Sequence, residues 1–430
     1  MKFTAVGDMI IQQRIYKEYK GYEELAPFIK QGDARFFNLE TTLNRAGEAC
    51  GSEFSGGTYI RTNPEVLEDI KPFGFNMTSF NNNHALDFSY EGLYKTLEAV
   101  EKSGFVHAGV GRNLDEAASP AYLETANGRV ALIAVNSSFE PSMMAGVQSP
   151  RYPGRAGING IRVNTHIELP KGDLEIIKRI ARDTKINAET EIVRAEGYRD
   201  ALPEDEAEFG ALRFKAGDTA KVVTKVNPKD LERVKKAIYE AQFQADYIII
   251  SVHSHQLSGD KKESPSEFLQ EFAHFCIDNG ANAIVGHGPH LLRPIEIYKE
   301  CPIFYSLGDF VLQLYSVESA PQDFFEKQTL LAAESTVHEL LKKRSKGFTV
   351  GLMEDRRMFI SVIPLWETEG GKLKKLTLLP IEMKMDGAKS DIGLPRISKD
   401  PEVLRYLAEM SEPYGTEITA GDDGLLHCKW

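Results

Sequence analysis

Side chains that can bind a divalent metal ion recur at six positions of this sequence, each within a short motif. They are Asp8 in AVGD, Glu40 in FFNLE, Asn83 in SFNNNH, His253 in IIISVH, and His287 and His290 in GHGPH. Two imidazoles three residues apart between glycine and proline do not fit a regular helix, so GHGPH indicates a loop. Carboxylate, amide and imidazole ligands without cysteine suit Mn, Fe or Zn better than a structural zinc site. We predict one or two divalent ions here, with Ca or Mg as alternatives.

Ions bound in this way would support hydrolysis. Two ions about 4 Å apart can stabilise both the attacking and the leaving oxygen of a phosphoryl displacement and generate hydroxide at neutral pH. Glu40 is the candidate for a bridging carboxylate. His84 follows Asn83 directly and is placed to act as a general acid or as an electrostatic stabiliser. The cations would also let an acidic chain accept an anionic substrate.

The candidate ligands stand at or just beyond the ends of apolar runs typical of β-strands. Amphipathic segments with helical spacing alternate with these runs, which predicts a layered α/β fold. Ligands bind at the carboxyl ends of strands in open α/β sheets, so we expect the metal-binding side chains to converge there. The expected strands are 3–6, 34–39, 77–80, 130–135, 247–252, 283–285 and 303–306, and the expected helices include 90–102, 228–244 and 265–279.

Two regions depart from the alternation. Residues 140–228 are rich in Gly, Pro and charge and contain a predicted helix near 173–183, so we expect an insertion that is either surface decoration or a lid that selects substrate. Segment 348–383 is expected to form β-strands, in FTVGLM, RRMFISVIPLWE and GGKLKKLTLLPIEM, and a helix is expected near 401–410. We predict a main domain of 1–365 and a C-terminal β extension and closing helix over 366–430, packed on the same domain.

Composition limits the class of partner. The 430 residues include 51 Lys or Arg against 63 Asp or Glu, a net charge of −12, which argues against nucleic acid as a partner. Four cysteines without CxxC spacing indicate a reducing compartment rather than a disulfide scaffold. Neither a signal-peptide core nor an apolar run of about 18 residues is present, so we expect a cytoplasmic protein without a membrane span.

The motifs, in order, resemble the CapA family, which is named for poly-γ-glutamate capsule biosynthesis. The matching stretches are AVGDMI, FFNLETTL, SFNNNHALDFSYEGLYKTLEAV, GVGRNLDEA, DYIIISVHSH, GANAIVGHGPHLLRPIEIYKECPIFYSLGDF and GLPRIS. The resemblance implies a calcineurin-like metallophosphoesterase fold, with central mixed sheets flanked by helices. It also implies that His84 is the family's histidine after the Asn ligand. The metal ligands that it implies are Asp8, Glu40, Asn83, His253, His287 and His290.

Several residues depart from the patterns of the family and of the wider superfamily. The superfamily's first strand ends in Asp-x-His, whereas Asp8 is followed by Met9 and Ile10. The superfamily's usual bridging Asp is replaced by Glu40 in this chain. The superfamily's last histidine pair is usually spaced as GHxH, whereas His287 and His290 are three residues apart. Where the family usually has SLGNF, this chain has Asp309, an extra carboxylate that we expect to face the substrate at the site edge. One metal position is therefore expected to be weaker, empty or differently filled.

Other polar residues leave alternatives open. His255 could replace His253 as a ligand, although His253 ends the apolar run. Arg155 and Arg162 in GRAGINGIR are candidates for binding a substrate carboxylate or phosphate.

Three functions remain open for this protein, whose expected ligand is a small-molecule or peptide-like anion. The first is metal-dependent hydrolysis, assisted by His84. The second is peptide epimerisation, in which Asp8 and a histidine of GHGPH, with His287 as the candidate, act on opposite faces of an α-carbon. The third is a non-catalytic metal-binding role in polyglutamate synthesis or export. We place hydrolysis first.

Overall fold

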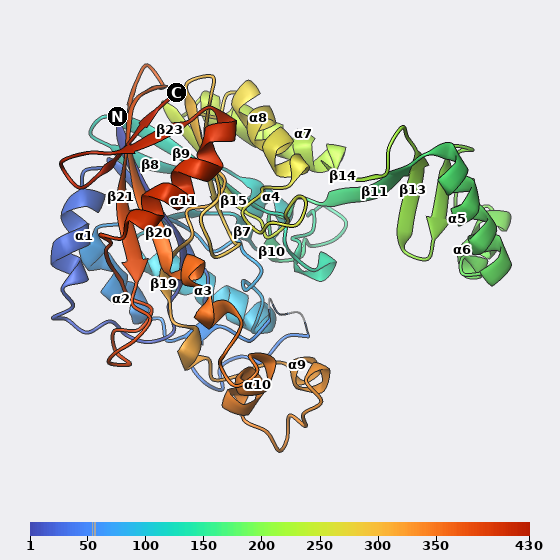
Figure 1. The fold of residues 1–430 in the computed structure, drawn as a ribbon, viewed down its shortest axis with the longest axis horizontal. Coiled ribbons are helices and arrows are strands. Elements are labelled where there is room, and N and C mark those ends of the chain that lie inside the picture. The colour runs from blue at the N-terminus through green and yellow to red at the C-terminus, as the bar shows by residue number, and fades with distance from the viewer. Residues whose placement is uncertain (54, 56) are drawn as a thin grey trace.

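A computed structural model describes residues 1–53, 55 and 57–430 and has a layered α/β architecture (Figure 1). In this part of the chain, ten strands form the larger sheet, in the order β23-β24-β21-β20-β1-β2-β5-β6, with β19 also pairing with β1 and β22 with β21. Strand β1 runs parallel to β2 and β19 and antiparallel to β20. The strands are β1 (Lys2–Ile10), β2 (Ala34–Leu39), β5 (Met77–Ser79), β6 (Val106–Ala108), β19 (Asp309–Leu312), β20 (Ile360–Glu369), β21 (Lys372–Met383), β22 (Pro395–Ile397), β23 (Glu417–Ala420) and β24 (Leu426–Lys429).

Six of the described strands form a second large sheet, in the order β17-β18-β16-β15-β9-β8. Its four central strands are parallel, and both edge strands are antiparallel. The central strand β15 is buried at every position, as expected for a parallel strand covered on both faces. The strands are β8 (Ala121–Thr125), β9 (Gly128–Asn136), β15 (Tyr247–His253), β16 (Ala283–His287), β17 (Ile295–Tyr298) and β18 (Cys301–Phe304).

The two large sheets pack against each other, and helices cover their outer faces. Phe36 of β2 belongs to the same buried apolar cluster as Ile249 of β15 and Val285 of β16, which places the central core between the sheets. Helices α1 (Gly21–Ile29), α2 (Val66–Ile70) and α3 (Ser89–Ser103) bury apolar faces on the outside of the larger sheet. Helices α7 (Pro228–Gln242) and α8 (Glu267–Asp278) do so on the second sheet. This arrangement confirms the expected layered, calcineurin-like fold class.

Within the insertion expected over 140–228, residues 163–226 form a small subdomain that projects from the body on β11 and β14 (Figure 1). The first part of the expected range belongs to the body, since Met143, Ala156 and Ile158 lie in the core cluster of the larger sheet. The strands of the subdomain lie in the order β12-β13-β11-β14, and its apolar core includes Leu174, Ala207 and Phe214. The helix predicted near 173–183 is α5. The elements are β11 (Val163–Leu169), α5 (Lys171–Thr184), α6 (Ala188–Ala195), β12 (Glu206–Phe209), β13 (Leu212–Ala216) and β14 (Lys221–Val226).

The C-terminal region belongs to the larger sheet. Strands β20 and β21 form a hairpin whose turn, Gly370-Gly371, has φ of 58° and 79°, which suits a type I′ turn. Helix α11 (Pro401–Ser411) buries Val403 and Leu407 in the core between the sheets, which agrees with the helix expected near 401–410. The domain division at residue 365 stays a prediction, and β20 runs across it.

The expectation of a strand in FTVGLM, residues 348–353, was wrong. These residues form turns and the start of a short 3₁₀ helix (Leu352–Glu354). Phe348 and Gly351 have φ of 61° and 109°, a conformation incompatible with an extended strand, and Val350 is exposed. The apolar composition alone was misleading because no neighbouring strand pairs with this segment in the described part of the chain.

The remaining helices are short and peripheral. They are α4 (Leu114–Ala118), α9 (Gln322–Lys327) and α10 (Val337–Arg344). None of the described helices combines the length and hydropathy that a bilayer-spanning segment needs.

Candidate metal centre

The candidate ligands converge where the carboxyl ends of strands from both large sheets meet. Asp8 lies in β1 beside an irregularity in its pairing with β2, and Glu40 follows β2 directly. His253 and His287 are the last residues of β15 and β16 and are paired across the two strands. Asn83 lies in the loop after β5. The alternation of strands and helices therefore brings distant segments to a common edge.

Asp8, His253 and His287 form the first group of side chains that can hold a metal ion. The Nδ1 atoms of the two imidazoles are 2.9 Å apart, and Asp8 Oδ1 lies 3.4 Å from His287 Nδ1 and 3.9 Å from His253 Nδ1. All three side chains are buried. A carboxylate and two imidazoles at these separations offer the oxygen and nitrogen ligands typical of a transition-metal site.

A second group consists of Glu40, His253 and His255. Glu40 Oε1 lies 3.7 Å from His253 Nε2, and the Nε2 atoms of His253 and His255 are 3.1 Å apart. Asn83 Oδ1 lies 2.6 Å from His253 Nε2 and 3.3 Å from His255 Nε2. The structure thus brings both His253 and His255 to the site, where the sequence suggested a choice between them. Because the two groups share His253, we name Asp8, Glu40, His253, His255 and His287 the histidine cluster.

His290 and Asp309 lie at the other side of Asp8. His290 Nδ1 is 3.0 Å from Asp309 Oδ1 and 3.7 Å from Asp8 Oδ2, and the three residues form a further group that can hold a metal ion. His290 has a φ of 60°, a conformation that costs a non-glycine residue about 1–3 kcal/mol and is typical of functional positions.

Neighbouring polar groups orient the candidate ligands. Asn38 Nδ2 donates to Asp8 Oδ1 at 2.7 Å, and the backbone N–H of Gly288 donates to Asp8 Oδ2 at 2.7 Å. Ser251 Oγ lies 2.8 Å from His287 Nε2, so the Nδ1 atom of His287 faces the cluster. The sequence reasoning missed these supporting residues. The alternation of side chains along a strand could have pointed to Ser251 and Asn38, because residues two apart lie on the same face. Ser251 lies two residues before His253, and Asn38 lies two residues before Glu40.

Burial sets the charge states of these groups. It raises the pKa of Glu40 well above its ordinary value, and the carboxylates of Asp8 and Asp309 raise it further. Burial lowers the pKa of His253, and it lowers that of His255 to about 3, which leaves these imidazoles neutral at neutral pH. Burial alone would raise the pKa of Asp8, but its contact with His287 and the charges of the nearby histidines lower it.

The surroundings of the Glu40 carboxylate indicate whether the histidine cluster fits a metal ion. Both of its carboxylate oxygens are buried and lack a hydrogen-bond partner among the described residues. A buried carboxylate without a partner is costly unless a cation or proton neutralises it, and neutral imidazoles are the form that binds metal. The residues present therefore fit a divalent ion.

His84 lies in the loop after β5, next to the candidate ligand Asn83. Its Nδ1 is 2.7 Å from Asp87 Oδ2, and its backbone N–H donates to Asn82 Oδ1 at 3.1 Å. The Asp87 carboxylate also accepts from the backbone N–H of Ile60 at 2.8 Å. This dyad fixes the ring of His84, with Nδ1 directed to Asp87.

Arg155 and Arg162 bind other parts of the protein. Arg155 Nε donates to the carbonyl of Met144 at 3.0 Å. Arg162 forms two guanidinium hydrogen bonds, both of 2.8 Å, with the buried carboxylate of Asp230. These contacts anchor the segment before β11, and no hydrogen bond or ion pair joins either guanidinium to the histidine cluster among the described residues.

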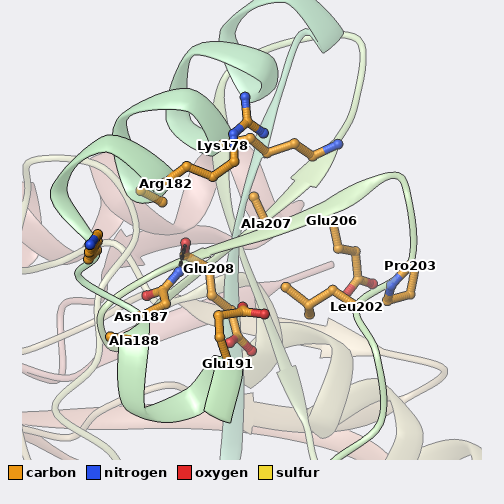
Figure 2. A pocket seen from close by; sticks show the side chains of 12 residues that line it. Lys178, Arg182, Asn187, Ala188, Glu191, Leu202, Pro203, Glu206, Ala207 and Glu208 are labelled. Carbon is orange, nitrogen blue, oxygen red and sulfur yellow. Dashed lines mark hydrogen bonds between the residues drawn. The ribbon is translucent and has the colours of Figure 1, made fainter. Parts of the chain in front are cut away.

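A cavity of about 560 Å³ lies in the insertion, away from the histidine cluster. Its lining includes Lys178 and Arg182 of α5 and Glu206 and Glu208 of β12 (Figure 2). Arg194 of α6 pairs with Glu208 at 2.7 Å. Because basic and acidic side chains both line this cavity, it does not select one sign of ligand charge.

Comparison with known proteins places this architecture in a family. The family model described as bacterial capsule synthesis protein PGA_cap matches residues 2–314. An uncharacterized protein of Sinorhizobium fredii is 32% identical over 97% of this chain and 91% of its own length. A probable polyglutamine synthesis accessory protein of Mycobacterium tuberculosis is 25% identical over 92% of this chain and 76% of its own. A capsule biosynthesis protein CapA of Bacillus anthracis is 21% identical over 72% and 59%. The chain therefore belongs to the PGA_cap family of bacterial capsule synthesis proteins, within the metallophosphoesterase-like superfamily.

Proposed function

We propose that this protein is a metal-dependent hydrolase of a phosphoester or a related anionic, peptide-like substrate. The observation that carries the proposal is the state of Glu40, whose carboxylate is buried and unpartnered among the described residues. It lies 3.7 Å from His253 Nε2 and 3.9 Å from His290 Nε2, between the two sides of the centre. A carboxylate in this position is suited to bridge two cations.

Asp8, Glu40, Asn83, His253, His287 and His290 would hold the metal, with His255 as an additional ligand. Divalent ions held there would supply hydroxide at neutral pH and electrostatic attraction for an anionic substrate. The chain itself has a net charge of −12, so this attraction must come from the centre rather than from the protein surface.

His84 would act on the leaving group. With Nδ1 held by Asp87, its Nε2 is the nitrogen available to carry a proton to the leaving oxygen. Asp8 would act as a ligand rather than as a base, because Asn38 and the N–H of Gly288 already donate to its two oxygens.

A non-catalytic role in polyglutamate synthesis is a second candidate. It is favoured by the name of the relative from Mycobacterium tuberculosis, an accessory protein. Epimerisation is a third candidate, favoured by Ile10 at the place where the superfamily has a histidine ligand.

Turnover of bis(p-nitrophenyl) phosphate with Mn, Zn or Fe tests the proposal. We expect hydrolysis that stops on chelation and in Glu40→Gln, and that persists in His166→Ala, which changes a histidine of the insertion. Deuterium incorporation at a peptide α-carbon without hydrolysis would replace the hydrolase by an epimerase. Metal-dependent stability with neither activity would favour the accessory role.

A further inference from the structure

The pairing of β1 with β19 places two acidic side chains side by side. Asp8 and Asp309 are partners in this parallel pair, and the backbone N–H of Asp8 donates to the carbonyl of Gly308 at 2.9 Å. The strands approach closely because residue 7 is glycine, where a Cβ would lie 1.8 Å from Gly308 O. Gly308, with a φ of 72°, turns the chain so that β19 begins at Asp309. Two glycines thus bring the carboxylates together.

The close approach of the two carboxylates matters because both are buried. Asp8 and Asp309 are both 0% exposed. Asp309 Oδ1 faces His290 Nδ1 at 3.0 Å, whereas Oδ2 is buried without a hydrogen-bond partner in the described residues. Two buried carboxylates side by side need a neutralising partner, and a cation bound at Asp309 Oδ2 would supply one.

The ligand atoms are also close enough to share an ion. One atom from each of Asp8, His290 and Asp309 lies within 4.8 Å of the other two. Asp8 uses Oδ1 toward His287 and Oδ2 toward His290, so its carboxylate reaches both sides of the centre. Glu40 also approaches this side of the centre, because its Oε1 lies 3.9 Å from His290 Nε2.

We propose that Asp8, His290 and Asp309 form a carboxylate-rich second cation position, with Asp309 as a direct ligand. The histidine cluster offers more imidazole, whereas this position offers two carboxylates and one imidazole. It therefore favours an oxygen-preferring divalent cation such as Mn²⁺. The inference rests on the proposed metal-dependent function but needs no turnover for its test.

Manganese binding to the full chain tests this position. Metal-free protein is titrated with Mn²⁺, and bound ions are counted from the loss of the free-ion EPR signal, with spin coupling between bound ions as a second readout. Wild type and Asp218→Asn, which changes an exposed residue of the insertion, should bind two ions per chain with coupled spectra. Asp309→Asn should bind one uncoupled ion, with affinity for the other lowered on the order of 100-fold.

Asp309→Ala separates ligation from orientation of His290. Asparagine can still accept a hydrogen bond from His290, so two coupled ions in Asp309→Asn but not in Asp309→Ala would overturn direct ligation. A wild-type protein with one ion would overturn the second position. Thermal melting of each variant in EDTA checks that it folds. If Asp309→Ala does not fold, the number of Mn²⁺ ions bound by Asp309→Asn alone decides whether Asp309 is a ligand. Absence of hydrolysis with two coupled ions would refute only the hydrolase.

Discussion

The carboxylate of Asp87 lies 2.7 Å from Nδ1 of His84, and both side chains are buried next to the candidate ligand Asn83. A carboxylate in this place selects the tautomer and fixes the ring, as the outer carboxylate does in other histidine dyads. The proposed transfer of a proton from His84 therefore depends on a residue that need not contact the substrate.

Replacing His84 by Ala should lower kcat by about 10²- to 10⁴-fold, because the leaving oxygen would lose its proton donor. Asp87→Asn should have a smaller effect of the same kind, about 10- to 100-fold. The measurement is kcat for aryl phosphodiesters of increasing leaving-group pKa. Poor leaving groups should suffer most, whereas an equal loss for all of them would contradict the assignment.

Arg293 should stabilise the loop that carries His255. It is 0% exposed and donates to the carbonyls of Lys262, Ser254 and His255 at 3.1, 3.4 and 3.4 Å, and burial lowers its pKa to about 10. Arg293→Met would leave these carbonyls without their donor, at a cost of about 1–3 kcal/mol. Urea unfolding should report this loss, together with weaker metal binding. The exposed Arg405→Met should change neither by more than about 0.5 kcal/mol.

Much of the site was predictable because hydrophobic runs end where the ligands begin. The run IIISV ends at His253 and AIVG ends at His287, and the structure gives these histidines the last positions of two neighbouring strands. The joint positions of His253 and His255 were not predictable, since they depend on the loop that follows β15.

Long-range pairing explains most of what the sequence could not give. Asp309 was expected to face substrate, but its place beside Asp8 follows from pairing between segments about 300 residues apart, which no local pattern encodes. The guanidinium of Arg162 was expected at the substrate, and its partner Asp230 lies across the whole insertion. In FTVGLM, strand-like composition was overridden by the absence of a pairing strand among the described residues.

The insertion should be removable without loss of the metal centre. Val163 of β11 pairs with Val226 of β14, and Asn227 N donates to Arg162 O at 2.8 Å, so the two ends of the subdomain are adjacent. Replacing residues 164–225 by a short Gly-rich turn should therefore leave a folded chain with unchanged metal content. Mass spectrometry of bound metal and thermal melting would check this. If the subdomain acts as a lid, activity toward large substrates should change more than activity toward small ones.

Acid should weaken the anchor of the insertion. Burial alone would raise the pKa of Asp230, but its hydrogen bonds with Arg162 and the charge of Arg233 lower it overall. The stabilisation that ionised Asp230 gives the folded protein is therefore complete above the ordinary aspartate pKa of about 3.9. It is lost as the pH falls through the lower pKa that Asp230 has in the folded protein. Asp230→Asn should cost about 1–3 kcal/mol near pH 7 and progressively less below pH 4. Urea unfolding across this range is the measurement, and a cost independent of pH would contradict the ion pair.

Chelation should destabilise the wild-type protein through Glu40. Without a cation, its buried carboxylate must take up a proton or remain unneutralised, since neither oxygen has a partner in the described chain. Metal at about 100 times its Kd should add about 2.7 kcal/mol of stability, which EDTA removes. In Glu40→Gln the side chain is already neutral and a poorer ligand, so EDTA should lower Tm much less. Thermal melts with and without Mn²⁺ compare the two proteins. An equal response would mean that the metal binds without Glu40, and the bridging role proposed for this residue would then be wrong.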